Sequence, residues 1–330
     1  MKQYKYFFGV DISKRTIDVT LVKDAELTHR KFSNDLKGMD ELMKWLVELN
    51  LNVNLALFCM EATGLYCFPL TQFLAKNEID IWIEHAAQIK KTTSLDRGKN
   101  DKVDSKRIAM YAVKHLDRLR LWKPASHTLE KIRHLATLRE RLVETRKKLV
   151  TPIQEFEEMG NVEMAKFLTK TIKSSLAALE RDLKNIETDI INIVNDDENL
   201  KHLYKLITSV VGIGFVTAIN LLIHTNGFTV LKDTRKLACY CGVAPFEYSS
   251  GSSVRGKTKV HFMANKKLKC NLHMASLSAV KADADLKAYY ERKILEGKNK
   301  LSVLNAVKNK LLARVIAVVN KQEEYVKKVA

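Results

Sequence analysis

The first part of the chain, up to about residue 83, alternates short apolar runs with stretches of helical apolar spacing. The run at Ile17–Val22 alternates with a period of two, and Gly38–Leu49 repeats its apolar positions every three or four residues. A three-strand meander followed by helix, strand, helix and strand predicts a mixed sheet with helices on its faces. The expected strands are Tyr6–Ile12, Ile17–Val22, Thr28–Phe32, Val53–Met60 and Ile79–Ile83, and the expected helices are Gly38–Leu49 and Tyr66–Lys76.

The middle of the chain has a different period. Its apolar residues are spaced alternately by four and three, as in the a/d seam of a coiled coil. A less regular stripe from Leu129 to Leu149 precedes the seam, and Pro152 is expected to end or bend that helix. Two long helices joined near Glu157–Asn161 predict a helical hairpin, which could pair within one chain or between chains. The seam consists of Ile172, Leu176, Leu179, Leu183, Ile186, Ile190 and Ile193.

The last part of the chain is expected to be mostly α-helical. Gly212 and Gly214 lie in Val211–Gly214 between apolar helical stretches, which is the form of a helix-hairpin-helix turn. Such a turn leaves N–H groups at a helix N-terminus to hold a phosphate, although most Gly-x-Gly pairs are only turns. Ser249–Lys257 is expected to be a polar, mobile loop. These patterns predict three domains: an α/β domain at 1–125, a coiled-coil hairpin at 126–197 and a helical domain at 198–330.

The distribution of charge indicates what the C-terminal part of the chain binds. The 330 residues contain 56 Lys+Arg and 38 Asp+Glu, a formal net charge of +18. From Ser250 to Ala330 there are 18 Lys+Arg against 6 Asp+Glu, so this segment carries +12 of that charge. A one-sided excess predicts a polyanion partner, with nucleic acid preferred over an acidic membrane, and a solvated lysine-rich surface is the alternative. The basic residues expected to contact phosphate are Arg255, Lys257, Lys259, Lys266 and Lys267.

The same composition excludes several classes. With 46% hydrophobic residues the chain can bury a core in each domain, which excludes wholesale disorder. Every apolar run is broken well before the roughly 20 residues that a membrane span needs, and Asp11 interrupts the apolar start, unlike a signal peptide. The five cysteines are odd in number and lack a zinc-ligand pattern, so reduced core thiols are expected. We therefore expect a cytoplasmic protein.

Four carboxylates fall at unusual places. Asp11 lies inside an apolar strand, Glu61 ends the next apolar strand, and Asp101 and Asp104 share one face at the start of an amphipathic helix. Buried carboxylates are costly, and a pair of divalent cations, which supports phosphoryl transfer, is a common compensation. The alternatives are that Asp101 is a helix N-cap, that Asp104 is a first-turn acid and that Glu61 is a solvated strand end. The placement of the four acids on two adjacent strands and one helix resembles that in the ribonuclease-H-like fold of RuvC-type resolvases.

Several short motifs, taken together and in order, resemble one family along nearly the whole chain. The chain is similar to the DEDD-type transposases of the insertion-sequence-110 family, which includes the Piv DNA invertases. The stretches that carry the resemblance are Gly9–Lys14, Met60–Gly64, Lys99–Ala109, Val211–Gly214 with Thr217 and Ala218, Gly242–Pro245 and Ser250–Ser252.

The resemblance implies a recombinase with an N-terminal RuvC-like domain and a C-terminal transposase domain carrying a nucleophilic serine. It implies that Asp11, Glu61, Asp101 and Asp104 are the catalytic acids that hold Mg²⁺, in a site for one or two ions. It further implies donor and target double-stranded DNA as partners, a structured non-coding guide RNA, and a homo-oligomer from dimer to tetramer.

Within the serine-rich segment the resemblance assigns the nucleophile to Ser250. Ser252 is the next candidate, followed by Ser249 and Ser253, and without the resemblance plain flexibility would explain these serines. Asn265 stands in Ala264-Asn265 where the family commonly has Gly-Asn, which leaves its role open.

The leading function is thus a serine-dependent, Mg²⁺-assisted transposase or site-specific DNA recombinase of an insertion sequence. A Piv-like DNA invertase and a metal-dependent junction nuclease that uses only the acids and water are the enzymatic alternatives. A basic coiled-coil scaffold that binds nucleic acid without catalysis is the non-enzymatic one.

Overall fold

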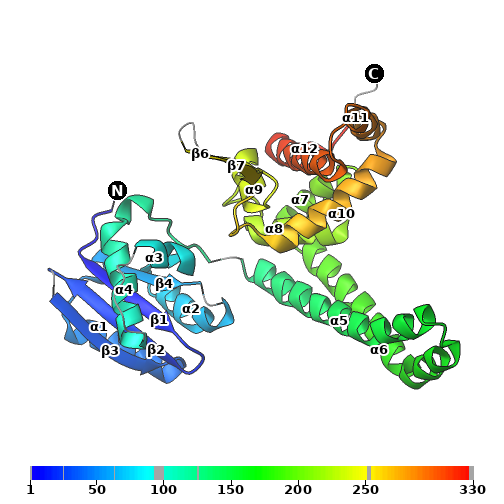
Figure 1. Cartoon of the computed structure of the whole chain (residues 1–330). Coiled ribbons are helices and arrows are strands. Elements are labelled where there is room, and N and C mark those ends of the chain that lie inside the picture. The colour runs from blue at the N-terminus through cyan, green and yellow to red at the C-terminus, as the bar shows by residue number, and fades with distance from the viewer. Residues whose placement is uncertain are drawn as a thin grey trace. The chain divides into compact units, whose positions relative to one another are not determined.

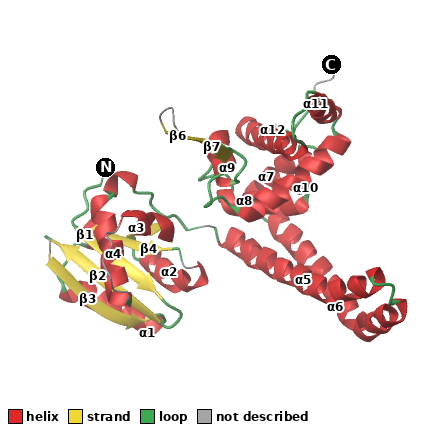
Figure 2. Cartoon of the chain, viewed as in Figure 1, coloured by secondary structure: helices red, strands yellow, loops and turns green. Residues whose placement is uncertain are grey.

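The computed structural model describes residues 2–24, 26–62, 64–92, 100–124, 126–250 and 254–326. The chain divides into two compact units, Met1–Pro124 and Ala125–Ala330, and each is described by itself. The first unit combines a sheet with helices, and the second unit is mainly helical (Figure 2). The expected α/β N-terminal part and helical C-terminal part are both confirmed.

A five-stranded mixed sheet forms the first unit (Figure 1). The strand order is β3-β2-β1-β4-β5; the pairs β1–β2 and β2–β3 are antiparallel, and the pairs β1–β4 and β4–β5 are parallel. The fourth strand starts later than predicted, because Asn52 caps a 3-10 turn at Val53–Leu55. The strands are β1 (Tyr6–Ile12), β2 (Thr16–Lys23), β3 (Glu26–Ser33), β4 (Ala56–Glu61) and β5 (Asp80–Glu84).

Helices cover both faces of this sheet, as the near-continuous apolar strands predicted. One face packs against α1 (Leu36–Glu48) and α2 (Phe68–Lys76), and its core includes Phe8 and Val10 of β1. The opposite face packs against α4 (Asp101–Lys114), and α3 (Ala86–Thr92) contributes Ile89 to that core. Because side chains alternate along a strand, Gly9 and Asp11 of β1 belong to the α4 face.

Gly9 sets the distance between α4 and the sheet. A Cβ atom at this position would lie 2.1 Å from the backbone nitrogen of Ala109 and 2.2 Å from the carbonyl oxygen of Ser105. Only a residue without a side chain therefore allows the α4 backbone to rest directly on β1. Next to this contact, a buried hydrogen bond of 2.7 Å joins the hydroxyls of Thr20 and Ser105 and fixes α4 to β2.

The second unit is built from helices around one core. A helical hairpin of α5 and α6 shares that core with the helices that follow it, through Leu129, Ile132, Ile190 and Val194. No helix among the described residues combines the length and apolar character needed to cross a membrane. The helices are α5 (His127–Glu158), α6 (Val162–Asn195), α7 (Glu198–Ser209), α8 (Phe215–Thr225), α9 (Thr234–Tyr240), α10 (Lys266–Ala282), α11 (Ala284–Leu295) and α12 (Lys300–Lys321).

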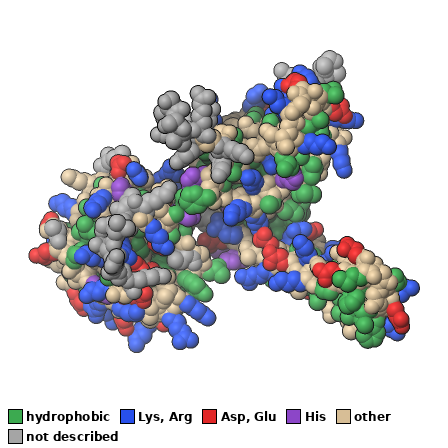
Figure 3. Space-filling view, viewed as in Figure 1, with side chains coloured by type: hydrophobic (Ala, Val, Ile, Leu, Met, Phe, Trp, Pro, Cys, Tyr) green, Lys and Arg blue, Asp and Glu red, His purple; other side chains and the backbone are tan. Residues whose placement is uncertain are grey.

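The hairpin corrects one expectation and reveals an apolar tip. Pro152 does not end its helix, since α5 continues to Glu158. At the turn between α5 and α6, apolar side chains gather on the surface (Figure 3). Met159 is 78% exposed and Phe167 is 64% exposed. The tip therefore presents apolar surface beside the exposed acids Glu157, Glu158 and Glu163.

The polar segment after Pro245, which was expected to be a loop, contains two strands. β6 (Phe246–Ser250) pairs antiparallel with β7 (Val254–Lys259), and we call this pair the β6–β7 ribbon. Its alternating Phe246 and Tyr248 on one strand, with Val254 on the other, are typical of a strand pair, but so few residues give a weak signal. Residues 251–253, with Ser252 and Ser253, lie outside the described residues.

Replacing Gly9 by alanine should destabilise the first unit by about 3 kcal/mol, because the new methyl group would overlap backbone atoms that cannot rotate away. All three tryptophans, Trp45, Trp82 and Trp122, belong to the first unit, so urea unfolding followed by tryptophan fluorescence reports on it alone. Gly64→Ala is the control. Its φ of +71° makes alanine cost about 1 kcal/mol, but its surroundings are open. Equal losses in the two variants would contradict the close packing of α4.

Candidate functional site

A row of five charged residues crosses the α4 face of the sheet, one on each strand. Asp11 of β1 is paired with Asp18 of β2, which is paired with Lys31 of β3. On the other side, Glu61 of β4 is paired with Glu84 of β5. Asp11 and Glu61 directly follow Val10 and Met60, which are registered partners on the parallel strands β1 and β4. The register therefore brings four carboxylates and one ammonium group to one level of the sheet.

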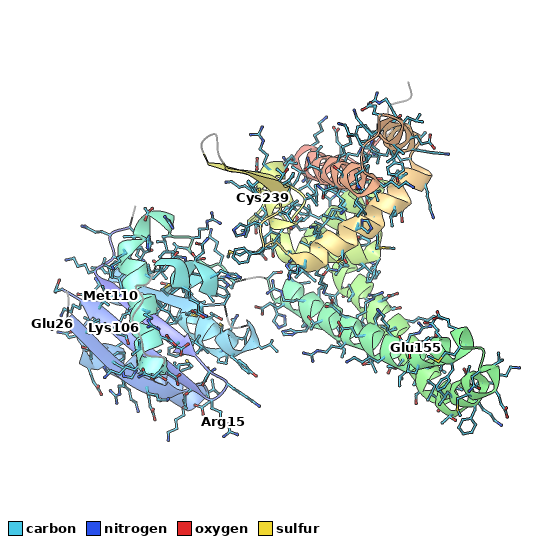
Figure 4. All side chains as sticks on the ribbon, viewed as in Figure 1. Arg15, Glu26, Lys106, Met110, Glu155 and Cys239 are labelled. Atoms are coloured by element: carbon cyan, nitrogen blue, oxygen red, sulfur yellow. The ribbon has the colours of Figure 1, made fainter. Side chains whose placement is uncertain are left out.

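The start of α4 supplies the remaining predicted acids. Asn100 is the N-cap, and its side chain accepts a hydrogen bond of 2.8 Å from the backbone N–H of Val103. Asp101 is therefore not the cap, and it lies with Asp104 in the first turn of the helix. Lys106 and Met110, labelled in Figure 4, mark the course of α4 over the sheet. The middle of α4 packs against Gly9 of β1. The first turn of α4 therefore lies near Asp11, which is two residues after Gly9 on the same strand.

The electrostatics show that the four predicted acids gather. The pKa of Asp11 is raised to about 6, first by burial and then by the negative charges of Asp101, Asp104 and Glu61, with a smaller effect of Asp18. A carboxylate whose neighbours are mostly other carboxylates has no nearby charge to stabilise its ionised form. The site thus accumulates negative charge around one half-buried side chain.

Cations already balance part of this charge. The Nζ of Lys31 lies 3.2 Å from an oxygen of Asp18 and 3.7 Å from one of Asp101. His29 Nε2 is 3.0 Å from the other oxygen of Asp18, and Arg107 donates a 2.9 Å hydrogen bond to Asp104. Asp11 and Glu61 have no such cation among the described residues, so they are the acids left without a balancing charge.

The carboxylates are the ligand type that a hard divalent cation prefers, but their side chains are not grouped closely enough to hold one. Carboxylate oxygens are the preferred protein ligands of Mg²⁺, and the raised pKa of Asp11 shows that positive charge is lacking there. In the part of the chain that the structure describes, however, no three His, Cys, Asp or Glu side chains are grouped to hold a metal ion. Asp101 and Asp104, which pair with Lys31 and Arg107, are the ligands that would have to turn inward.

Three members of the charged row were missed by sequence reasoning. Asp18 is only 4% exposed, and its partners are His29 and Lys31. Glu84 accepts a 3.2 Å hydrogen bond from the hydroxyl of Tyr111 on α4, and it contributes to raising the pKa of that hydroxyl to about 12 after the larger effect of burial. A signal existed for Asp18, because the short turn after Ile12 predicts a hairpin in which Asp11 and Asp18 face each other.

The predicted nucleophile occupies the end of a strand in the second unit. Ser250 is the last residue of β6, where it pairs with Val254 of β7, and Ser249 pairs with Arg255. Arg255, Lys257 and Lys259 all belong to β7. For these residues the structure describes the backbone pairing, and their side chains lie outside the described part. The backbone therefore presents Ser250 beside the tip of a short basic ribbon.

A partly buried polar network closes the base of this ribbon. Tyr240 ends α9 before the ribbon and Asn265 caps α10 after it, and the Asn265 N–H donates a 2.7 Å hydrogen bond to the Tyr240 carbonyl. The Asn265 amide lies 3.2 Å from the Tyr240 hydroxyl and 3.3 Å from His224 Nδ1, and the hydroxyl is 3.1 Å from the same nitrogen. Burial, with the charges of Arg133 and Lys267, lowers the pKa of His224 to about 4, so the ring is neutral at pH 7. We call His224, Tyr240 and Asn265 the ribbon clamp.

Of the other residues predicted to contact nucleic acid, some are engaged in packing or an ion pair and others are accessible. Gly212 has φ +96° and presses against α10, where a Cβ would lie 2.6 Å from that of Ala279, so packing accounts for this glycine. Gly214 is the N-cap of α8 and has open space around it. Lys266 is exposed at the start of α10, whereas Lys267 forms a 2.7 Å ion pair with Glu140 of α5. Gly214 and Lys266 are thus the more accessible of these residues.

Comparison with known proteins places both units among transposases. Residues 8–156 match a DEDD-type family model described as "Transposase", and residues 204–291 match one described as "Transposase IS116/IS110/IS902 family". The pilin gene-inverting protein of Moraxella bovis is 24% identical over 329 residues, which cover 98% of this chain and 99% of that protein; its Moraxella lacunata counterpart matches equally. An insertion element IS110 protein of Streptomyces coelicolor is 28% identical over 134 residues, 41% of this chain and 32% of that protein.

Replacing Asp11 by asparagine should stabilise the first unit at pH 7.5 and leave its stability unchanged at pH 4. The raised pKa means that the folded protein holds the Asp11 proton more tightly than the unfolded chain does. Stability is therefore lost as the pH rises from about 4 to about 6, and the neutral amide avoids this loss. We expect a gain of about 1 kcal/mol, less than the full shift implies because the carboxyl is partly open to water. Urea unfolding with a chelator present, followed by tryptophan fluorescence, measures it; a loss of stability at pH 7.5 would refute the crowding of charge.

Two substitutions of Asn265 separate its capping bond from its place in the ribbon clamp. Asn265→Ser keeps a side-chain oxygen for the N–H of Leu268 but removes the amide, and should cost about 1 kcal/mol. Asn265→Ala removes both and should cost about 2 kcal/mol. Thermal unfolding followed by far-ultraviolet circular dichroism, which the helical second unit dominates, provides the comparison. A serine variant as stable as the wild type would show that the clamp adds nothing.

Proposed function

The chain belongs to the IS110 family of transposases and is a DNA recombinase, and on that basis we propose that it cuts and rejoins DNA through Ser250 with the help of a divalent cation. The observation that supports this proposal most is the gathering of Asp11, Glu61, Asp101 and Asp104 at one end of α4. A DEDD-type transposase domain suggests dependence on a divalent metal ion. We propose Mg²⁺ as that ion and a RuvC-like fold for the first unit.

Within the acidic cluster, Asp11 and Glu61 would hold the cation first, since they have no balancing positive charge. Asp104 and Asp101 would complete the set from the first turn of α4. A bound Mg²⁺ would polarise a phosphate oxygen and stabilise the charge that develops in phosphoryl transfer. The chain's own contribution is to fix the backbone of the four carboxylates on strands and a helix, while the side chains of Asp101 and Asp104 would have to leave Lys31 and Arg107 to complete the set.

Ser250 supplies the covalent step in this proposal. Its Oγ loses a proton and forms a bond to phosphorus, the bond from phosphorus to one deoxyribose oxygen breaks, and that oxygen takes up a proton. The phosphoserine ester keeps the energy of the broken bond, so a second DNA end can reverse the step and rejoin. The ribbon clamp supports this role, because it holds both ends of the β6–β7 ribbon at one place in the helical core.

The partners follow from the family in the same proposal. Donor and target double-stranded DNA would bind the basic residues Arg255, Lys257, Lys259 and Lys266, with Gly214 offering N–H groups at the start of α8. A structured non-coding RNA would select the DNA sites by base pairing. The exposed apolar tip of the α5–α6 hairpin supports assembly of several copies.

DNA inversion is a second candidate outcome of the same chemistry. The relatives that match this chain along nearly their whole length are named pilin gene-inverting proteins, whereas the insertion-element protein matches over 41% of this chain. Inversion and transposition share cleavage and rejoining and differ in which DNA ends are joined. Both therefore need the same site residues.

Incubation of the protein with Mg²⁺, labelled duplex DNA carrying the ends of its element and RNA transcribed from the same flanks should give a covalent protein–DNA adduct. Ser250→Ala and Asp11→Asn should each reduce the adduct by at least about 100-fold, since each removes a group used in the chemical step. Ser249→Ala is the matched control and should retain the adduct. Denaturing gel electrophoresis after nuclease trimming measures it.

The other results would contradict parts of the proposal. An adduct that persists in Ser250→Ala would place the nucleophile elsewhere, with Ser252→Ala as the next variant. Metal-dependent cutting without any adduct would favour a junction nuclease, and cutting unaffected by Asp11→Asn would remove the acidic cluster from catalysis.

A further inference from the structure

Two lysines beside the base of the β6–β7 ribbon have no acidic partner. Lys308 of α12 is only 6% exposed, and Lys269 of α10 is partly buried. Neither forms a salt bridge with any residue that the structure describes. The charged or ionisable groups that act on Lys308 are Lys269 and the thiol of Cys270, and burial and Lys269 both lower its pKa. The stem of Lys308 is therefore buried, whereas its ammonium group is not among the fully buried polar atoms, and among the described residues it has another ammonium group and no acid as its charged neighbour.

Such an arrangement is uncommon in a core. Lysine is almost never this deeply buried unless it is paired, because removing its charge from water is costly. The neighbouring positions on α12 are ordinary core residues: Leu304, Leu311 and Leu312 are buried within the same turns. A hydrophobic residue at position 308 would suit that surface better, so stability of the fold does not explain this lysine.

The lysines lie against the segment that leads into the ribbon. Asn305, one turn before Lys308, donates a 2.8 Å hydrogen bond to the carbonyl of Val243. The side chain of Lys269 approaches Gly242, with its Cδ 3.5 Å from where a Cβ would be. Gly242 and Val243 lie in the short segment between the end of α9 at Tyr240 and the start of β6 at Phe246. The cationic pair therefore lies at the base of the strand that ends in Ser250.

We propose that Lys308 and Lys269 form an anion subsite that binds one backbone phosphate of the nucleic acid handled by the β6–β7 ribbon. A phosphodiester carries the single negative charge that the pair lacks, and the flexible lysine stems can both reach one phosphate as point charges. The subsite rests on the proposed function, since it assumes that the nucleic acid at the ribbon is the substrate or its guide. It adds Lys308 and Lys269 to the residues that hold that nucleic acid.

Lys308→Met in the full chain tests the subsite, because stability and binding should change in opposite directions. Without anions the variant should unfold at a higher temperature than the wild type, since an unpaired buried charge is removed. Inorganic phosphate at constant ionic strength should raise the unfolding temperature of the wild type and have little effect on the variant. Lys310→Met, on the same helix but exposed, is the matched control and should keep the phosphate effect.

Equilibrium binding identifies the source of the phosphate. Labelled duplex DNA and a labelled structured RNA are titrated separately over a range of salt concentrations. Lys308→Met should weaken binding of at least one of them roughly three- to tenfold near 0.15 M salt and reduce the salt dependence by about one phosphate contact. The arm that changes shows whether DNA or RNA fills the subsite.

Two results would overturn the subsite: a phosphate effect equal in wild type and Lys308→Met, or unchanged affinity for both nucleic acids. These measurements involve no cleavage, so they are independent of the Ser250 adduct. A missing adduct with normal phosphate binding would refute the proposed function and leave the anion subsite in place.

Discussion

The direct contact between α4 and β1 is the constraint on which the acidic cluster depends. Gly9 lets the helix backbone approach the strand to a distance that no side chain would permit, and the Thr20–Ser105 hydrogen bond holds it there. With the middle of α4 fixed, its first turn is carried toward the carboxyl end of β1. Asp101 and Asp104 thereby come close enough to raise the pKa of Asp11. A residue with no chemistry of its own thus determines the geometry of four acids.

The charged row brings several carboxylates together on one sheet, and some of them have counterions that limit the loss of stability. Each strand contributes one charged residue at the same level, and Lys31 balances the carboxylate of Asp18, which is also within hydrogen-bonding distance of His29. Asp11 and Glu61 have no such partners among the described residues, and burial makes the charge of Asp11 more costly. The charge gathered around Asp11 therefore costs the first unit some stability at neutral pH, and we propose that a bound cation relieves this cost.

The second unit solves a different problem, which is to hold a short two-stranded ribbon on a helical core. Two strands alone are marginally stable, so the base of the ribbon must be fixed from outside. The ribbon clamp does this with neutral, hydrogen-bonded groups, as expected where burial opposes charge. Lys308 and Lys269, close to the same base, are the exception, because no acid among the described residues compensates their charge. The neutral groups of the ribbon clamp hold the ribbon, and we propose that the two lysines bind a phosphate of the nucleic acid.

The sequence by itself determined the strand and helix pattern, the coiled-coil hairpin and the four acids, because local periodicity and a misplaced carboxylate are visible in one dimension. It missed Asp18, Glu84 and Lys31, whose meaning depends on strand register, and the ribbon strands, which are too short for a clear period. It predicted that Pro152 ends or bends its helix, and α5 in fact continues past Pro152 to Glu158. Tertiary structure alone decided which charges have partners, since counterions such as Lys31 for Asp101 come from residues far apart in the chain. Among the described residues, Asp18, Asp101 and Asp104 have such a partner, whereas Asp11 and Glu61 have none.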